Sequence, residues 1–190
     1  MDDRFLLFGL ESFNELLNQA LPKSVNWETS LTKIASSGLD ENKMTMLLGQ
    51  FAKILMDPIE NLDEEMKYHV NKQVSHAFDK KLVIKSDLAG ELTIELLKNE
   101  PHMKIKKSTQ EDLSKLPVIS FNKDVLLSIL SGKATMLEMI LKKEMVITQT
   151  VLLADALTRF LLAIPALYLT NKELLNTLQV GLQQFLTQFN

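Results

Sequence analysis

The apolar residues of this chain change their spacing twice along the sequence, and this change limits the folds that it can adopt. Up to about residue 78 they recur every three or four positions, which is the spacing of amphipathic helices. Between Leu82 and Phe121 they alternate with polar residues, which is the period of half-buried strands. Beyond Asn122 the helical spacing returns. Helices on both sides of a run of strands predict an α+β domain.

The first part of the chain predicts four amphipathic helices. Pro22 and Pro58 end the first and the third, because proline cannot continue a helix. Asp40 is placed to cap the third helix. Asn61, with Glu64 three positions later, resembles a capping box for the fourth.

The middle of the chain predicts a mostly antiparallel sheet of about five strands. In the expected third strand, the alternation places His102 on the side opposite Met103 and Ile105, and therefore outward. The loop 99–101 would join the second and third strands as a hairpin. We expect strands at 82–85, 92–96, 102–106, 118–121 and 145–148.

The segment 151–169 is close to the length that spans a membrane. Asp155 and Arg159 lie inside it, four positions apart, and Pro165 interrupts it. The two charges share one helix face and can pair, and we expect a buried or surface helix of a soluble protein. A last amphipathic helix is expected at 172–189.

Composition narrows the classes of function. The net charge is −3, and the lysine clusters have no aromatic residues between them, so we expect no binding of nucleic acid. The chain contains no cysteine, which excludes disulfides, thiolate metal sites and thiol catalysis. The N-terminus opens with two aspartates and does not resemble a signal peptide. We therefore expect a cytoplasmic protein.

No residue pattern in the chain points to catalysis. His69 and His76 are seven positions apart, so on one helix they would be about 10 Å apart along the axis, too far to bind one metal directly. No two acidic residues have the spacing of a general acid–base pair. We expect neither an enzyme nor a bound cofactor or metal. If the chain were an enzyme, His102 would be the best candidate.

The segment 118–160 reads VISFNKDVLLSILSGKATMLEMILKKEMVITQTVLLADALTRF. It resembles the C-terminal half of the sterol carrier protein 2 family, which is a family of lipid-binding domains. Segment 62–96 also faintly resembles the accessory factors of ubiquinone biosynthesis that contain such a domain. The elements that carry the resemblance are Val118–Phe121, Asp124, Leu126-Leu127, Gly132-Lys133, Met145–Ile147 and Leu152-Leu153-Ala154.

Two positions depart from the family's pattern in a way that concerns the backbone. Lys143 and Gln149 stand where the family usually has glycines, one on either side of the last strand. In addition, Thr150 replaces a residue that tends to be acidic. Without the two glycines, we expect both turns to be made with ordinary, negative φ values.

The resemblance implies a sheet of about five strands covered by helices, with a hydrophobic tunnel that holds a lipid. It places this lipid-binding domain at 61–190, after an N-terminal helical extension at 1–60. A pocket for a fatty acyl, sterol-like or isoprenoid lipid needs apolar walls, and methionines adapt to varied ligands. The expected lining is Val125, Leu126, Ile129, Leu130, Met136, Met139, Ile140, Ile147, Leu157, Phe160 and Leu161.

Two other interpretations of the same apolar residues stay open. Apolar residues at helical spacing also form an ordinary solid core. The terminal helices would then dock a partner protein or a second copy of the chain. In the lipid-binding interpretation, the last helix would instead act as a lid or contact a membrane surface peripherally.

Overall fold

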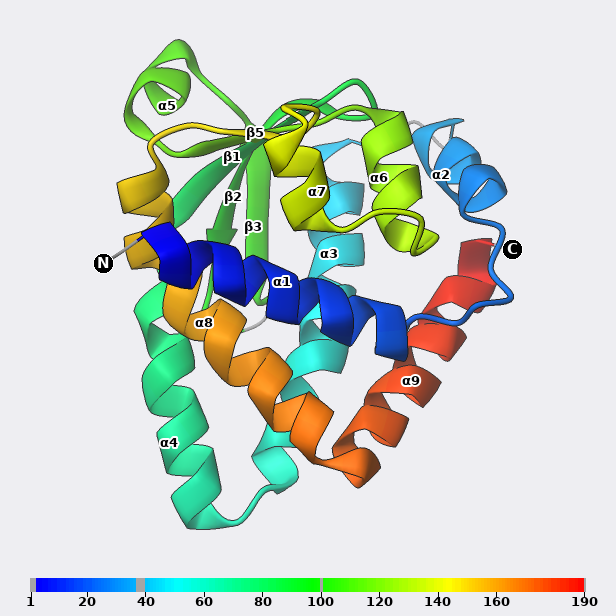
Figure 1. The fold of residues 1–190 in the computed structure, drawn as a ribbon, viewed down its shortest axis with the longest axis vertical. Coiled ribbons are helices and arrows are strands. Elements are labelled where there is room, and N and C mark those ends of the chain that lie inside the picture. The colour runs from blue at the N-terminus through cyan, green and yellow to red at the C-terminus, as the bar shows by residue number, and fades with distance from the viewer. Residues whose placement is uncertain (1–2, 37–39, 100, 190) are drawn as a thin grey trace.

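The computed structural model describes residues 3–36, 40–99 and 101–189, and it has the predicted α+β architecture (Figure 1). A five-stranded sheet has the strand order β3-β2-β1-β4-β5. The pairing of β1 with β4 is parallel, and the other pairings are antiparallel. The strands are β1 (Lys81–Ser86), β2 (Gly90–Leu96), β3 (Met103–Lys107), β4 (Val118–Ser120) and β5 (Val146–Ile147).

Helices precede, interrupt and follow the sheet. Before it come α1 (Asp3–Ala20), α2 (Trp27–Ser36), α3 (Glu41–Met56), the 3-10 helix η1 (Asp57–Asn61), α4 (Glu64–Val74) and η2 (Ser75–Ala77). Between strands lie α5 (Gln110–Lys115), α6 (Lys123–Leu130) and α7 (Met136–Leu141). After the sheet come α8 (Thr150–Thr170), α9 (Lys172–Leu186) and η3 (Thr187–Phe189).

Helix α8 lies at the centre of the core. Leu153, Ile164 and Tyr168 on it are completely buried, and α1 packs along it. In the described part of the chain, α8 is the one helix whose length and composition would allow it to cross a membrane. Its charges do not pair with each other as expected. Asp155 pairs with Lys80 on one side, and Arg159 contacts His76.

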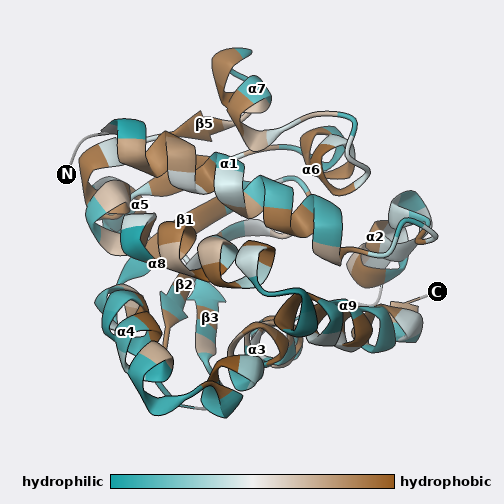
Figure 2. Ribbon diagram, turned by 60° about the horizontal axis from the view of Figure 1, so that its bottom comes forward, coloured by the Kyte–Doolittle hydropathy of each residue, from teal (hydrophilic) through white to brown (hydrophobic). Residues whose placement is uncertain are grey.

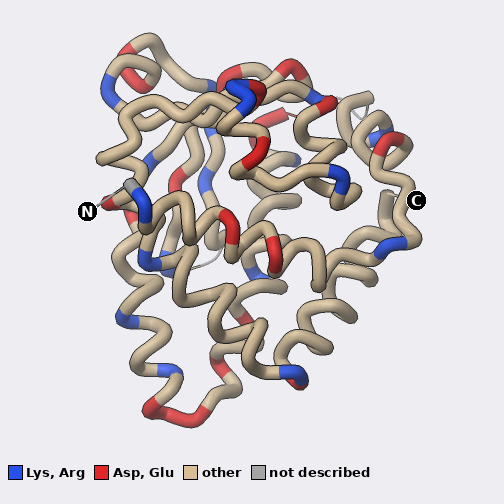
Figure 3. Tube along the Cα trace, in the orientation of Figure 1, with Lys and Arg blue, Asp and Glu red and all other residues tan. Residues whose placement is uncertain are grey.

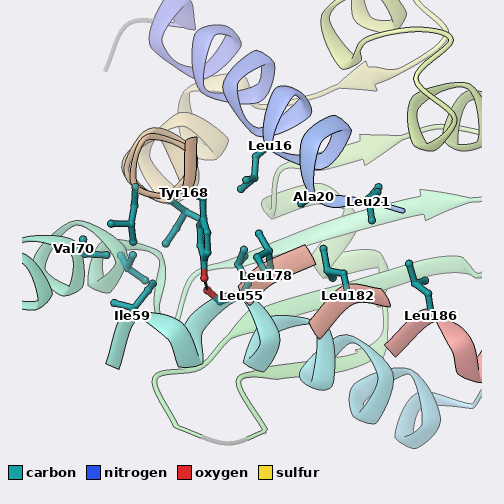
Figure 4. Packing of buried hydrophobic residues seen from close by; sticks show 13 residues of the cluster. Leu16, Ala20, Leu21, Leu55, Ile59, Val70, Tyr168, Leu178, Leu182 and Leu186 are labelled. Atoms are coloured by element: carbon teal, nitrogen blue, oxygen red, sulfur yellow. Dashed lines mark hydrogen bonds between the residues drawn. The ribbon is translucent and has the colours of Figure 1, made fainter. Parts of the chain in front are cut away.

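The largest core cluster joins α8 to α1, α3, η1, α4 and α9 (Figure 4). Hydrophilic and hydrophobic residues alternate along α4 and α9 (Figure 2), and their apolar sides supply Val70, Leu178 and Leu182 to this cluster. Helix α9 carries no charged residue after Glu173 (Figure 3). The buried leucines of α9 make the last helix part of the core. Its expected role as a lid or a membrane contact stays a prediction.

Side chains of α3 cover the outer edge of β3. The Thr45 hydroxyl accepts a hydrogen bond from the Ile105 amide at 3.2 Å and donates one to the Ile105 carbonyl at 3.5 Å. The Lys107 amide donates to the Glu41 carboxylate at 2.8 Å. An unpaired strand edge promotes association with other chains. The hydrogen bonds with α3 pair backbone groups at the edge of β3 that would otherwise be exposed.

One helix start differs from the sequence prediction. The expected capping box of Asn61 and Glu64 does not form, because the chain after Pro58 continues as η1 as far as Asn61. Asp63 caps α4 instead, and its carboxylate accepts a hydrogen bond from the Met66 amide at 2.9 Å. The cap expected from Asp40 is confirmed.

The expectation of ordinary φ values at Lys143 and Gln149 is also wrong. Both residues are left-handed, with φ of 60° and 52°. The Lys143 amide donates to the Ile140 carbonyl at the end of α7, and the Gln149 carbonyl accepts from Leu153 in the first turn of α8. These hydrogen bonds hold the backbone in a conformation that glycine adopts with less strain.

Replacing one of these residues with glycine should therefore stabilise the fold. We expect Lys143→Gly to raise the free energy of unfolding by about 0.5–1 kcal/mol, because it relieves left-handed strain. Lys142→Gly is the control, because Lys142 has a right-handed φ of −76° and glycine there only adds entropy to the unfolded chain. Urea unfolding of both variants measures the difference, and equal destabilisation by both would refute this account of residue 143.

Candidate functional site

An enclosed hollow of about 370 Å³ lies beside the core, where four parts of the chain meet. The end of α3 with η1, the α4–η2 segment, the turn between β2 and β3, and α8 surround it. Its lining residues are Ala52, Leu55, Met56, Asp57, Glu60, Asn71, Ser75, Phe78, Leu96, Leu97, Lys98, Asn99, His102, Met103 and Phe160.

The inner part of the hollow is apolar. Leu55 and Ala52, both on α3, are buried, and Phe160 of α8 and Phe78 before β1 are half-buried. The hydrogen bond from the Tyr168 hydroxyl to the Leu55 carbonyl, at 2.7 Å, ties α8 to the end of α3 directly behind this floor (Figure 4). Burial, with a smaller contribution from the Asp57 carboxylate, raises the pKa of Tyr168 above its ordinary value. Tyr168 therefore stays neutral and has a structural role.

Polar residues form the rim. Two acidic residues, Asp57 and Glu60, come from η1, and Asn71 and Ser75 come from α4 and η2. The β2–β3 turn supplies the rest, which are Lys98, Asn99 and His102. A concave apolar surface with a few convergent polar groups is the usual form of a small-molecule site.

The β2–β3 turn is held in place by its own hydrogen bonds and by a close contact with α3. The His102 amide donates to the Asn99 carbonyl at 2.9 Å, and the Leu97 amide donates to the His102 carbonyl at 2.8 Å. A Cβ atom at Gly49 would lie 2.5 Å from the Pro101 carbonyl oxygen, so only glycine lets the turn approach α3 this closely. This contact fixes one wall of the hollow.

His102 differs from its predicted position. It precedes β3 instead of belonging to it, its φ is 63°, and its half-buried side chain lines the hollow. The strict alternation expected from residue 102 onward begins only at Met103, because the turn residue before the strand is left-handed. The expectation that His102 points outward with Lys104 is therefore wrong.

The structure places the residues predicted to line a lipid tunnel mainly in packed clusters. Val125, Ile129 and Met139 are buried together with Ala134, and Met136 and Ile140 pack beside them. Leu161 is buried against α1, with Ile147, Leu157 and Phe160 around it. Leu130 packs at the margin of the largest cluster, and Leu126 is half-buried on α6. Of these predicted residues, Phe160 also lines the enclosed hollow.

Two other hollows are less suited to hold an apolar molecule. An open groove of about 690 Å³ at one end of the sheet includes Lys85, Asp87 and Glu144. A hollow of about 430 Å³ beside Trp27 is lined by Leu130 together with Asn18 and Lys23. The groove is open to solvent and is lined mostly by charged and polar residues, and polar atoms make up more than half of the surface of the hollow beside Trp27.

The described residues contain no group of three or more histidine or acidic side chains that could hold a metal ion. His69 lies edge-on against Tyr68, with 5.7 Å between the ring centroids, and His76 contacts Arg159. The chain matches no family model, no curated protein and no solved structure.

The contact between Gly49 and Pro101 can be tested by adding one methyl group. We expect Gly49→Ala to lower the free energy of unfolding by about 1–3 kcal/mol, because the turn must move away from α3. Amide hydrogen exchange at Leu97 and His102 should become faster.

Gly181→Ala is the matched control, because its Cβ would meet a methyl group of Ile54 at 2.9 Å and, among the described residues, no backbone atom of another element. The helix propensity gained from alanine offsets part of the cost of this contact, and we expect unchanged exchange in the turn. A turn unaffected by Gly49→Ala would contradict the role given to this glycine.

Proposed function

We propose that this protein binds a hydrophobic ligand non-covalently, as sterol carrier protein 2 domains do, and that the ligand occupies the hollow between α3, α4, α8 and the β2–β3 turn. A fatty acyl, sterol-like or isoprenoid lipid fits this proposal. The observation that carries it is the combination of enclosure, an apolar floor around Leu55 and Phe160, and a polar rim.

Burial of apolar ligand surface would drive binding. Removing about 200 Å² of ligand surface from water is worth about 5 kcal/mol at 25 cal/mol per Å². The loss of freedom on association opposes this gain. The ligand is held and released without a chemical step, and the proposal assigns no residue a catalytic role.

Filling the hollow should abolish ligand binding. Ala52 lines the hollow from α3 and is 6% exposed, so a larger side chain there can enter the empty space. We expect Ala52→Phe to weaken the binding of Nile red, an uncharged apolar dye, at least tenfold. Its free energy of unfolding should change by less than about 1.5 kcal/mol, because the ring occupies space that already exists.

Ala134→Phe is the matched control. It places the same large side chain beside α6 and α7, where the sequence predicts the lipid tunnel. Ala134 is 8% exposed and packs with Val125 and Ile129, away from the hollow. We expect it to lose about 1–3 kcal/mol of stability through overpacking and to keep dye binding at temperatures where it is folded. Loss of binding in Ala134→Phe, with binding retained in Ala52→Phe, would move the ligand to the α6–α7 region.

Docking of a partner protein or a second copy is the second candidate function. Phe5 and Phe8 on α1 are 56% and 61% exposed, which is high for phenylalanine. Light scattering on the full chain and on a Phe5→Ser, Phe8→Ser variant tests this idea. A chain that is monomeric at high concentration in both forms would refute self-association through α1.

A further inference from the structure

We propose that the hollow prefers amphiphiles whose head group is uncharged and carries hydroxyls, such as monoacylglycerols or long-chain alcohols, over fatty acids. This inference rests on the proposed function, and it names the ligand class. Three features of the rim carry it: its charge balance, its side chains that have no hydrogen-bond partner among the described residues, and the conformation of His102.

The charges around the mouth of the hollow nearly cancel. The Glu60 carboxylate lies 2.7 Å from the Lys67 ammonium, which neutralises it. Among the described residues that line the hollow, the other charged side chains are Asp57 on η1 and Lys98 on the β2–β3 turn. The contribution of Asp57 to the raised pKa of Tyr168 indicates that its negative potential extends toward the floor.

Such a rim disfavours a carboxylate ligand. An ionised carboxylate loses far more hydration energy on burial than a hydroxyl does, and it recovers the loss only beside a dedicated cation. Lys98 is exposed and is opposed by Asp57, so the rim gives a carboxylate no net attraction. A hydroxyl has a smaller loss to recover, and neutral hydrogen bonds are sufficient for that.

Three other side chains on the rim can make such bonds. The amides of Asn71 and Asn99 donate and accept hydrogen bonds, and the imidazole of His102 offers two ring nitrogens. Within the part of the chain that the structure describes, none of the three has a side-chain hydrogen bond, and Asn71 and His102 are half-buried. Half-buried polar groups without a partner favour a ligand that supplies one.

His102 is also held in a backbone conformation that is uncommon for residues other than glycine. Its φ of 63° lies in the left-handed region, and two backbone hydrogen bonds keep the turn closed around it. Non-glycine residues in this region cluster at binding sites, where the surrounding structure maintains them. Here the conformation brings the imidazole to the rim instead of leaving it beside Lys104 on β3.

The test is displacement of Nile red from the full chain at pH 7.4 by 1-monopalmitoylglycerol and by palmitate, each below its aggregation concentration. We expect the monoacylglycerol to displace the dye at a concentration at least tenfold lower. Asp57→Asn should strengthen palmitate binding severalfold and leave monoacylglycerol binding unchanged, because it removes only the opposing charge.

Asn71→Leu keeps the branched shape of the side chain and removes its hydrogen-bonding groups. We expect it to weaken monoacylglycerol binding at least fivefold while Nile red binding is retained. Gln73→Leu is the control, because Gln73 is an exposed residue on the same helix that does not line the hollow. An equal loss of monoacylglycerol binding in both variants would show that the effect comes from α4 as a whole. This result would overturn the role of Asn71.

The outcomes separate the inference from the proposed function. If palmitate displaces the dye as well as the monoacylglycerol does, the head-group preference is overturned and lipid binding stands. If Nile red does not bind and neither lipid protects the chain from thermal unfolding, lipid binding in the hollow is overturned as well.

Discussion

The packing of apolar side chains around α8 is the interaction on which the rest of the structure depends. Leu153, Ile164 and Tyr168 are completely buried, and they link the two largest core clusters. Helix α1 lies so close to α8 that a Cβ atom at Gly9 would be 2.9 Å from the Leu161 Cβ. Without α8, neither the helices nor the inner face of the sheet would have a common surface to pack against.

The hollow forms at the edge of this core, where α3 passes into η1. The Tyr168 hydroxyl binds the Leu55 carbonyl, so the last turn of α3 is held against α8 just before the chain turns into η1. The β2–β3 turn closes the opposite side through its contact with Gly49. Helix ends and turns present few side chains that can fill the space between them, and a cavity remains where they meet.

Much of the fold could be predicted from the sequence, because its signals are local. Apolar spacing indicated the helices and the strands, and a single residue such as Asp40 indicated a helix start. The left-handed turns at Lys143 and Gln149 could not be predicted, because neither residue carries the glycine signal of such a turn. Hydrogen bonds to the neighbouring helices stabilise these turns.

The hollow itself could not be predicted, because its walls come from distant parts of the chain. Gly49 and Pro101 meet only in the folded structure, and His102 reaches the rim through a turn that looks like a strand in the sequence. An apolar residue such as Val125 gives no indication of whether it lines a cavity or fills a core. The lipid-binding role predicted for the α6–α7 residues therefore stays a prediction beside the hollow described here.

Methyl NMR of the full chain with an added monoacylglycerol tests the central claim most directly. If the ligand occupies the hollow, nuclear Overhauser effects will connect its acyl chain to the methyl groups of Leu55, Met56 and Met103. Contacts to Val125, Ile129 and Met139 without contacts to the first group would contradict the account and place the ligand between α6 and α7.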